Sequence, residues 1–164
     1  MFRTAAGRLA HTYSIVARDP DTGEMGVAVQ SHWFSVGSVV AWAAAGAGAV
    51  ATQSMVNPLF GPLGLELLRN GRTAAETVAE LIAADEHREV RQLAVVDGSG
   101  RTAAFTGDRC IPQCGHLAGN GFSVQANMMT SGEVWPSMAR AFERAEGPLA
   151  ERMVAALEAA EAEG

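Results

Sequence analysis

Thr12 is the residue of this chain best placed by type and position to act as a nucleophile. Residues 13–17 alternate with a period of two, which predicts a β-strand that begins at Thr12. A threonine at the N-terminus of a chain can attack a carbonyl with its hydroxyl while its own α-amine, with a pKa of about 7.7–8.0, accepts the proton. Thr12 could do this only if its bond to His11 is first broken, so the alternative of an ordinary strand residue stays open.

Polar side chains in otherwise apolar strands are candidates for binding a substrate or an oxyanion. Ser31 closes the second predicted strand, and Gln53 and Asn57 flank the end of the fourth. Gln125 and Asn127 lie two apart in the last predicted strand, which places them on one face. Such groups could hold an oxyanion or orient an amide, or they could satisfy backbone groups in a polar core. Their number favours a shared polar pocket.

Cys110, Cys114 and His116 have a C-x3-C-x-H spacing that superficially resembles part of a zinc site. A structural zinc site uses four ligands, and the sequence offers no second pair at ligand spacing. Cys110 could instead be a catalytic thiol, but no positively charged or helix-N-terminal setting that would lower its pKa can be read from the sequence. We therefore expect no metal and no other cofactor, with a metal-binding module centred on Cys110 as the weakest alternative.

The composition excludes several classes of function. The 164 residues are 48% hydrophobic, which suits a single domain with a core, and the net charge of −6 argues against a nucleic-acid partner. All twelve basic residues are arginine, so no mechanism can use a lysine. Residues 25–65 carry no charged side chain, but they are too rich in glycine for a membrane span and favour buried strands. We expect no membrane partner and a cytoplasmic location.

Strands and helices are predicted to come in alternating groups. Turn residues typical of hairpins separate the strand pairs, and the predicted helices have apolar stripes. Asn70-Gly71 is a C-terminal signal for the first helix, and Thr73 with Glu76 forms a capping box at the start of the second. The order is four strands, two helices, three strands and two helices: strands 12–18, 25–31, 38–44 and 47–54, helices 60–69 and 73–84, strands 88–97, 101–107 and 121–129, and helices 132–145 and 148–162. This order predicts two stacked, mainly antiparallel sheets between helical layers rather than a doubly wound parallel sheet.

The chain resembles an uncharacterised family, the domain of unknown function numbered 1028, which is similar to the N-terminal-nucleophile (Ntn) hydrolases. The resemblance covers Thr12 to the end and rests on the segments TYSIVARDPDTGEMGVAVQS, GAVATQSMVNPLFGPLGLELLRNG, REVRQLAVVDGSGRTAAFTG, CGHLAGNGFSVQANMM and AFERAEGPLAERMVAALEAAEAEG. It implies an α+β fold, a four-layer αββα sandwich of two antiparallel sheets flanked by helix pairs. The wider superfamily implies an amidohydrolase with Thr12 as nucleophile and a small amide or peptide-like ligand.

Two departures from the family pattern shape the remaining expectations. Residues 1–11 are an extension before a single domain at 12–164, so removal of an initiator methionine cannot expose Thr12. Relatives continue into further strands after the last helix, so the domain is expected to lack C-terminal strands. The uncharged strands and the truncated sheet favour a homodimer. The alternative to an enzyme is a catalytically silent scaffold that binds a ligand or assembles with itself.

Overall fold

A computed structural model describes residues 11–164 of the chain, which form two sheets and five helices. The elements in chain order are β1 Thr12–Arg18, β2 Met25–Ser31, α1 Gly37–Val40, β3 Ala41–Ala44, β4 Gly48–Ser54, α2 Phe60–Arg69, α3 Ala74–Ala83, a 3₁₀ turn Arg88–Val90, β5 Arg91–Asp97, β6 Thr102–Thr106, β7 Gly115–Gly119, β8 Phe122–Asn127, α4 Val134–Arg144 and α5 Leu149–Glu163.

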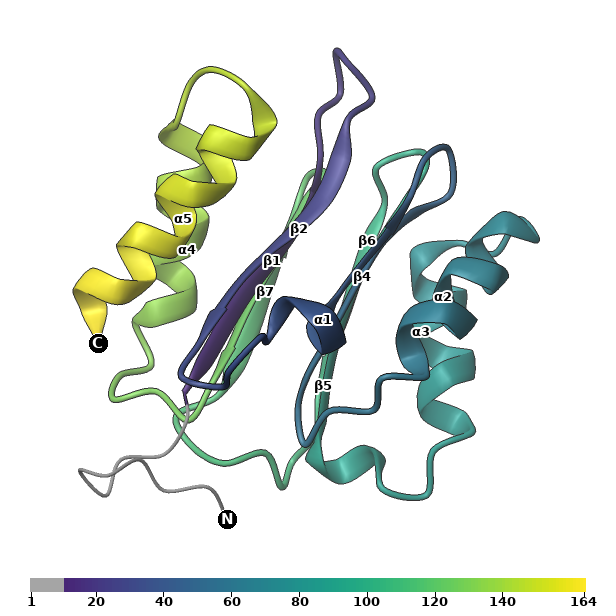
Figure 1. Cartoon of the computed structure of the whole chain (residues 1–164), viewed down its shortest axis with the longest axis horizontal. Coiled ribbons are helices and arrows are strands. Elements are labelled where there is room, and N and C mark those ends of the chain that lie inside the picture. The colour runs from purple at the N-terminus through teal and green to yellow at the C-terminus, as the bar shows by residue number, and fades with distance from the viewer. Residues whose placement is uncertain (1–10) are drawn as a thin grey trace.

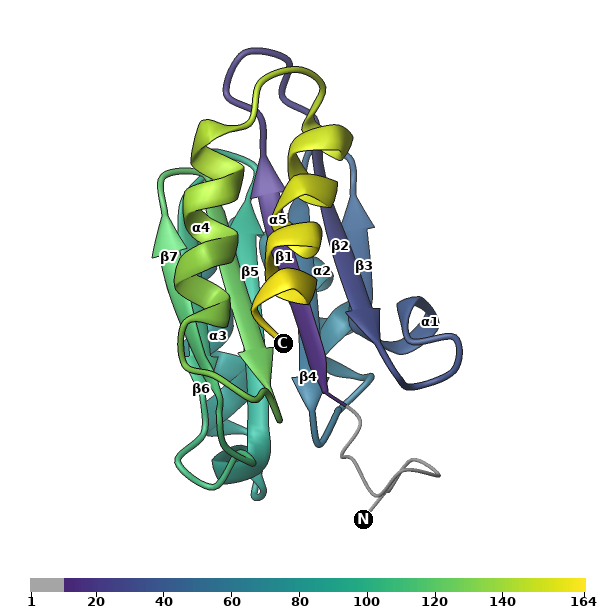
Figure 2. The same cartoon turned by 90° about the vertical axis from the view of Figure 1, so that its left-hand side faces the viewer.

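The elements are arranged in four layers (Figure 1). One sheet has the strand order β2-β1-β8-β7 and the other β3-β4-β5-β6, and all neighbouring strands are antiparallel. The pair α4/α5 covers the outer face of the first sheet, which Figure 2 shows face on, and α2/α3 covers the second. The predicted α+β sandwich of two antiparallel sheets flanked by helix pairs is confirmed.

The first hairpin, β1 and β2, forms as predicted and brings Thr12 opposite Ser31. Its turn is closed by Asp19, whose Oδ1 accepts the backbone N–H groups of Asp21 and Thr22 at 3.0 and 2.9 Å. The register that this turn sets pairs Thr12 with Ser31 at the open end, while β8 lies on the other side of β1 and pairs Asn127 with Thr12. The hairpin therefore places three polar residues side by side.

The alternation along β1 decides which layer each side chain enters. Tyr13 and Ile15 are buried in the core beneath α4 and α5, whereas Val16 is buried in the core between the two sheets. Because side chains alternate along a strand, Thr12 and Ser14 share the face of Val16 and lie toward the opposite sheet. The candidate nucleophile thus belongs to the layer between the sheets.

The second hairpin differs from the prediction, because residues 38–40 are helical rather than extended. They belong to the single turn α1, which begins after Ser35, a residue with φ +57° whose carbonyl accepts the Ser38 N–H at 3.0 Å. Val36, Val39 and Val40 have the i, i+3, i+4 spacing of a helix face and pack on the core between the sheets. A similar difference occurs at residues 88–90, which form the 3₁₀ turn before β5.

The helices agree closely with the predicted ranges. α2 ends before Asn70-Gly71, with Gly71 in the left-handed region at φ +86°, as its C-terminal signal predicts. Before α3, the Thr73 hydroxyl accepts the N–H of Glu76 and the Glu76 carboxylate accepts the N–H of Thr73, so the predicted capping box is confirmed.

Strand β7 was not predicted from the sequence. Its residues, Gly115 to Gly119, show no clear alternation of apolar side chains. The two glycines are required by close approach: a Cβ on Gly115 would lie 2.5 Å from the Trp135 ring, and one on Gly119 would lie 2.3 Å from the Phe122 ring. Neighbouring aromatic rings therefore provide the apolar surface that the strand itself lacks.

No helix within residues 11–164 is long and apolar enough to cross a membrane. The uncharged residues 25–65 instead form β2, β3 and β4, with α1 and the first half of α2. Residues 1–10 lie outside the described part of the chain, and with them the predicted extension at 1–11 except for His11.

Asp97 is expected to make the stability of the protein sensitive to acid. The residue is 3% exposed, and its carboxylate accepts hydrogen bonds from Ala74 N, Ser99 N, Ser99 Oγ and Arg101. Burial raises the pKa of Asp97, but the bonds from Ser99, Ala74 and Arg101 together hold it below its usual value. The stabilisation is therefore present above the unfolded pKa of about 3.9 and is lost as pH falls through the lower folded value. Urea unfolding between about pH 2 and 5 should show this loss of stability. Asp97→Asn should make stability depend less on pH in this range and should lower the free energy of unfolding at pH 7 by about 2–3 kcal/mol. An acid dependence of stability that is the same in the variant as in the wild type would contradict this role of Asp97.

Candidate active site

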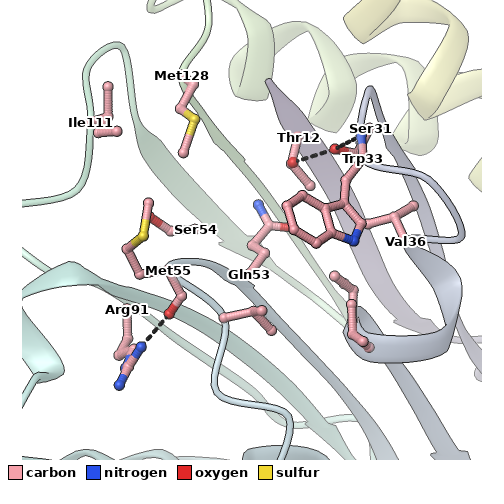
Figure 3. Close-up of a pocket in the computed structure, with 13 residues that line it drawn as sticks. Thr12, Ser31, Trp33, Val36, Gln53, Ser54, Met55, Arg91, Ile111 and Met128 are labelled. Atoms are coloured by element: carbon pink, nitrogen blue, oxygen red, sulfur yellow. Dashed lines mark hydrogen bonds between the residues drawn. The ribbon is translucent and has the colours of Figure 1, made fainter. Parts of the chain in front are cut away.

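A cavity of about 340 Å³ lies at the open end of the first hairpin, next to Thr12 (Figure 3). It is bordered by both sheets and by the segments that leave β2, β4 and β8. The lining residues are Thr12, Ser31, Trp33, Val36, Val39, Val40, Gln53, Ser54, Met55, Val56, Arg91, Ile111 and Met128.

Thr12 and Ser31 form a hydrogen-bonded pair at this cavity. Their hydroxyl oxygens are 2.8 Å apart, and Thr12 is 8% exposed (Figure 3). Ser31 Oγ also donates to the carbonyl oxygen of His11 at 3.1 Å and accepts the N–H of Trp33 at 3.0 Å. The rings of His11 and His32 contact each other in a T-shaped arrangement, with their centroids 4.1 Å apart. The Ser31 hydroxyl thus touches both partners of the His11–Thr12 bond.

The direction of these hydrogen bonds follows from their chemistry. A carbonyl oxygen only accepts, so the single proton of the Ser31 hydroxyl goes to His11. The proton in the 2.8 Å contact must then come from Thr12, which donates to Ser31. Thr12, Ser31 and the His11 carbonyl oxygen therefore form a continuous path along which a proton can pass.

A second polar cluster lies deeper between the sheets, and its orientation is fixed by Gln92. The Nε2 of Gln92 donates to the carbonyls of Gly115 and Ala126 at 3.1 and 3.0 Å, so its Oε1 must face the other way. There it accepts from Gln53 Nε2 at 2.7 Å and Asn127 Nδ2 at 3.0 Å. Both neighbouring amides are therefore oriented with their nitrogen toward Gln92.

The same reasoning extends along the cluster from Gln53. Its Oε1 accepts the Ser14 hydroxyl at 2.6 Å, and Ser14 Oγ in turn accepts Gln125 Nε2 at 2.6 Å. Gln125 Oε1 then accepts the hydroxyl of Ser123 at 3.2 Å. Gln53 has a further contact from its Nε2 to the Gln125 carbonyl at 3.4 Å, so both of its N–H groups are used inside the cluster.

The predicted candidates therefore separate into two groups. Thr12, Ser31 and Gln53 line the cavity, although Gln53 has no N–H group left to offer a substrate. Gln125 and Asn127 share one face, as their spacing predicts, but they lie in the buried cluster and not in the cavity wall. Asn57 does not line the cavity, and its Oδ1 accepts the N–H of Leu59 at 3.2 Å, just before α2.

Arg91 is the charged residue among the described residues that line the cavity, and its charge is balanced. Its Nε donates to Asp85 Oδ2 at 2.7 Å, and its Nη1 donates to the Met55 carbonyl at 2.6 Å (Figure 3). The hydrogen bond from Arg91 holds the pKa of Asp85 below its usual value despite burial, so the Asp85 carboxylate is ionised at neutral pH and balances the guanidinium charge. The cavity therefore presents no net charge to a ligand.

Comparison with known protein families matches residues 12–164 to the family described as "Family of unknown function (DUF1028)". The chain belongs to this family. It is also similar to the crystal structure of protein SPO2555 from Silicibacter pomeroyi, which is described with the same family. The two chains are 33% identical with a TM-score of 0.90 over 94% of this chain and 69% of the other. Comparison with curated proteins gave no significant match.

The cysteines of this DUF1028 chain do not form a metal site. Within residues 11–164, no three side chains of His, Cys, Asp or Glu lie close enough together to hold a metal ion. Cys110 is buried, with its Sγ 3.3 Å from the Arg91 carbonyl, and burial raises the pKa of both Cys110 and Cys114. A raised pKa disfavours the thiolate, so Cys110 is poorly suited to act as a nucleophile.

Most of the residues that line the cavity of this DUF1028 chain were not predicted from the sequence. Its apolar walls come from loops and from α1, where no sequence signal separates a cavity wall from a core. Two lining residues, Ser54 at φ +68° and Met128 at φ +61°, have left-handed backbone conformations that are uncommon for non-glycine residues. Ser14 and Gln92 could have been found, because each is a polar residue at an inward position of a buried strand.

Proposed function

We propose that this DUF1028 chain is an Ntn-type amidohydrolase whose nucleophile is the Thr12 hydroxyl. The proposal is carried by one observation: Ser31 Oγ donates to the carbonyl oxygen of the bond that must break and accepts from the hydroxyl that would attack it. An ordinary strand start does not require a serine to connect the two groups. The base is the freed α-amine of Thr12, and the sequence contains no lysine that could assist it.

The first step is cleavage of the chain by itself at His11–Thr12. The Thr12 oxygen attacks the His11 carbonyl carbon, its proton passes to Ser31, and the Ser31 proton passes to the carbonyl oxygen. Collapse of this tetrahedral species breaks the C–N bond, returns the proton to the nitrogen and leaves residue 11 as an ester on the Thr12 oxygen. Water then hydrolyses the ester, which gives a carboxylate on His11 and a free α-amine on Thr12.

The same atoms then act on a substrate amide. The Thr12 oxygen attacks the substrate carbonyl, the α-amine takes its proton and delivers it to the leaving amine, and water releases the acyl group from the ester. Ser31 Oγ, freed from the His11 carbonyl, becomes the donor for the oxyanion. The substrate acyl group occupies the cavity that begins at Thr12.

Intact-mass measurement of the purified protein tests this proposal. We expect the wild-type chain to lose the mass of residues 1–11 during purification or incubation and then to hydrolyse acyl p-nitroanilides. Thr12→Ala should keep the full mass and show no hydrolysis, whereas Thr22→Ala, at the far end of the same hairpin, should behave as wild type. A wild-type chain that stays at full mass on long incubation would contradict the proposal and favour the catalytically silent scaffold.

A further inference from the structure

The wall of the cavity is mostly apolar, with Thr12 and Ser31 at one end and Gln53, Ser54 and Arg91 as the other polar or charged residues that line it. Val36 lies on one side, and Met55, Ile111 and Met128 lie on the opposite side (Figure 3). Val39 and Val40 of α1 also line the cavity. Thr12 and Ser31 are therefore placed to contact the carbonyl group of a ligand, and the rest of the cavity is placed to contact the acyl chain attached to that carbonyl. Apolar walls with a few placed polar groups are typical of small-molecule sites.

The charges and hydrogen bonds of the cavity wall restrict which acyl group can bind there. Arg91 is paired with Asp85 and with the Met55 carbonyl, so its charge is already balanced, and a ligand carboxylate would place a second negative charge beside one guanidinium. Gln53, the amide in the wall, has both N–H groups engaged with Gln92 and Gln125. A carboxylate or an ammonium on the acyl group would lose its hydration here without gaining a counter-ion, because the remaining polar groups of the wall, Ser54 included, are neutral.

The size of the cavity sets an upper limit on the acyl group. Its volume of about 340 Å³ lies at the small end of the range for ligand sites. Since a water molecule in the liquid takes about 30 Å³, the space accommodates on the order of ten non-hydrogen atoms.

From these observations we infer that the cavity is a binding site for an uncharged apolar acyl group, so that the substrates are amides of small aliphatic or aromatic monocarboxylic acids. Amides of dicarboxylic acids, or of acyl groups with a free carboxylate or ammonium, are excluded by the same walls. The catalytic part of this inference rests on the proposed function, but the preference in binding does not.

Binding of two matched ketones tests the inference without any catalysis. 2-Octanone and 7-oxooctanoate share a methyl ketone and differ only in ending with a methyl group or a carboxylate, and neither can be hydrolysed. In wild-type protein with ¹³C-labelled methionine methyls, 2-octanone should shift the signals of Met55 and Met128, which line the cavity. The signals of Met138 on α4 and Met153 on α5, which are buried in the core between these helices and the first sheet, should not shift. We expect 2-octanone to bind at least roughly tenfold more tightly than 7-oxooctanoate.

A charge placed in the wall should reverse this preference. In Val39→Lys the new ammonium is expected to favour 7-oxooctanoate over 2-octanone by roughly tenfold. Val154→Lys is the matched control, because Val154 is half exposed on α5, away from the cavity, and should leave both affinities unchanged. The wild-type comparison stands even if Val39→Lys fails to fold.

The outcomes separate this inference from the proposed function. Equal or tighter binding of 7-oxooctanoate by the wild-type protein, or no shift of Met55 and Met128 with either ketone at millimolar concentration, would overturn the inference even if Thr12 is processed. Selective binding of 2-octanone by a chain that stays unprocessed would support the inference while the proposed function fails.

Discussion

Replacement of Ser31 with alanine is expected to slow cleavage of the His11–Thr12 bond by roughly 10²-fold or more, a typical effect of removing one oxyanion donor. In the intact chain the Ser31 hydroxyl donates to the His11 carbonyl at 3.1 Å and accepts from Thr12 at 2.8 Å. Ser31→Ala removes both contacts, so the carbonyl is no longer polarised and the Thr12 proton has no path to its oxygen. The change is expected to leave the fold intact, because Ser31 lies at the end of β2 and is partly exposed.

The fraction of full-length chain, followed by intact mass over hours to days after rapid purification, measures this effect. Ser31→Thr keeps a hydroxyl on the same strand position and should restore most of the rate, which a purely structural role for the small side chain would not predict. Ser38→Ala, on the exposed turn of α1, is a matched control and should cleave as wild type. Cleavage of Ser31→Ala at the wild-type rate would remove Ser31 from the mechanism.

The layers of the fold could be predicted because local signals and burial agree. The first hairpin has a Pro-Asp-Thr-Gly turn between alternating strands, and α3 has a complete capping box, so each boundary has its own chemical cause. β7 and α1 could not be predicted in the same way. β7 has no apolar pattern of its own and depends on the rings of Phe122, in the strand that follows it, and of Trp135, in α4.

The site was only partly predictable for a related reason. The sequence points to Thr12 and Ser31 because strand position and side-chain chemistry are local properties. It does not show that Gln53 has its donors engaged, since that depends on Gln92, which lies 39 residues away. Sequence spacing placed Gln125 and Asn127 on the correct face, but only the pairing of sheets separates a buried network from a cavity wall.

Gln92→Leu is expected to lower the free energy of unfolding by about 3–5 kcal/mol, because several buried polar groups would lose their partner at once. Gln92 is fully buried, and its amide oxygen accepts from Gln53 and Asn127. The two N–H groups of its Nε2 are shared among three acceptors within hydrogen-bond distance: Thr106 Oγ1 and the carbonyls of Gly115 and Ala126. Leucine fills a similar volume, so the loss reports on unpaired polar groups more than on a cavity. For a chain of this length the loss corresponds to a decrease in melting temperature of roughly 10 °C.

Urea unfolding and thermal melting measure this decrease, and a double-mutant cycle assigns it. Gln113→Leu, an exposed position of the same residue type, should change stability by less than about 0.5 kcal/mol. Gln53→Leu alone should also be destabilising, because Ser14 and Gln92 lose a partner. The double replacement should be less damaging than the sum of the two by about 0.5–3 kcal/mol, since the two amides bond directly and cannot both lose the same contact. Two results would contradict this prediction: a decrease below about 1 kcal/mol in the free energy of unfolding of Gln92→Leu, or strictly additive effects of Gln92→Leu and Gln53→Leu. Either would mean that water satisfies these polar groups and that Gln92 does not fix the orientation of the neighbouring amides.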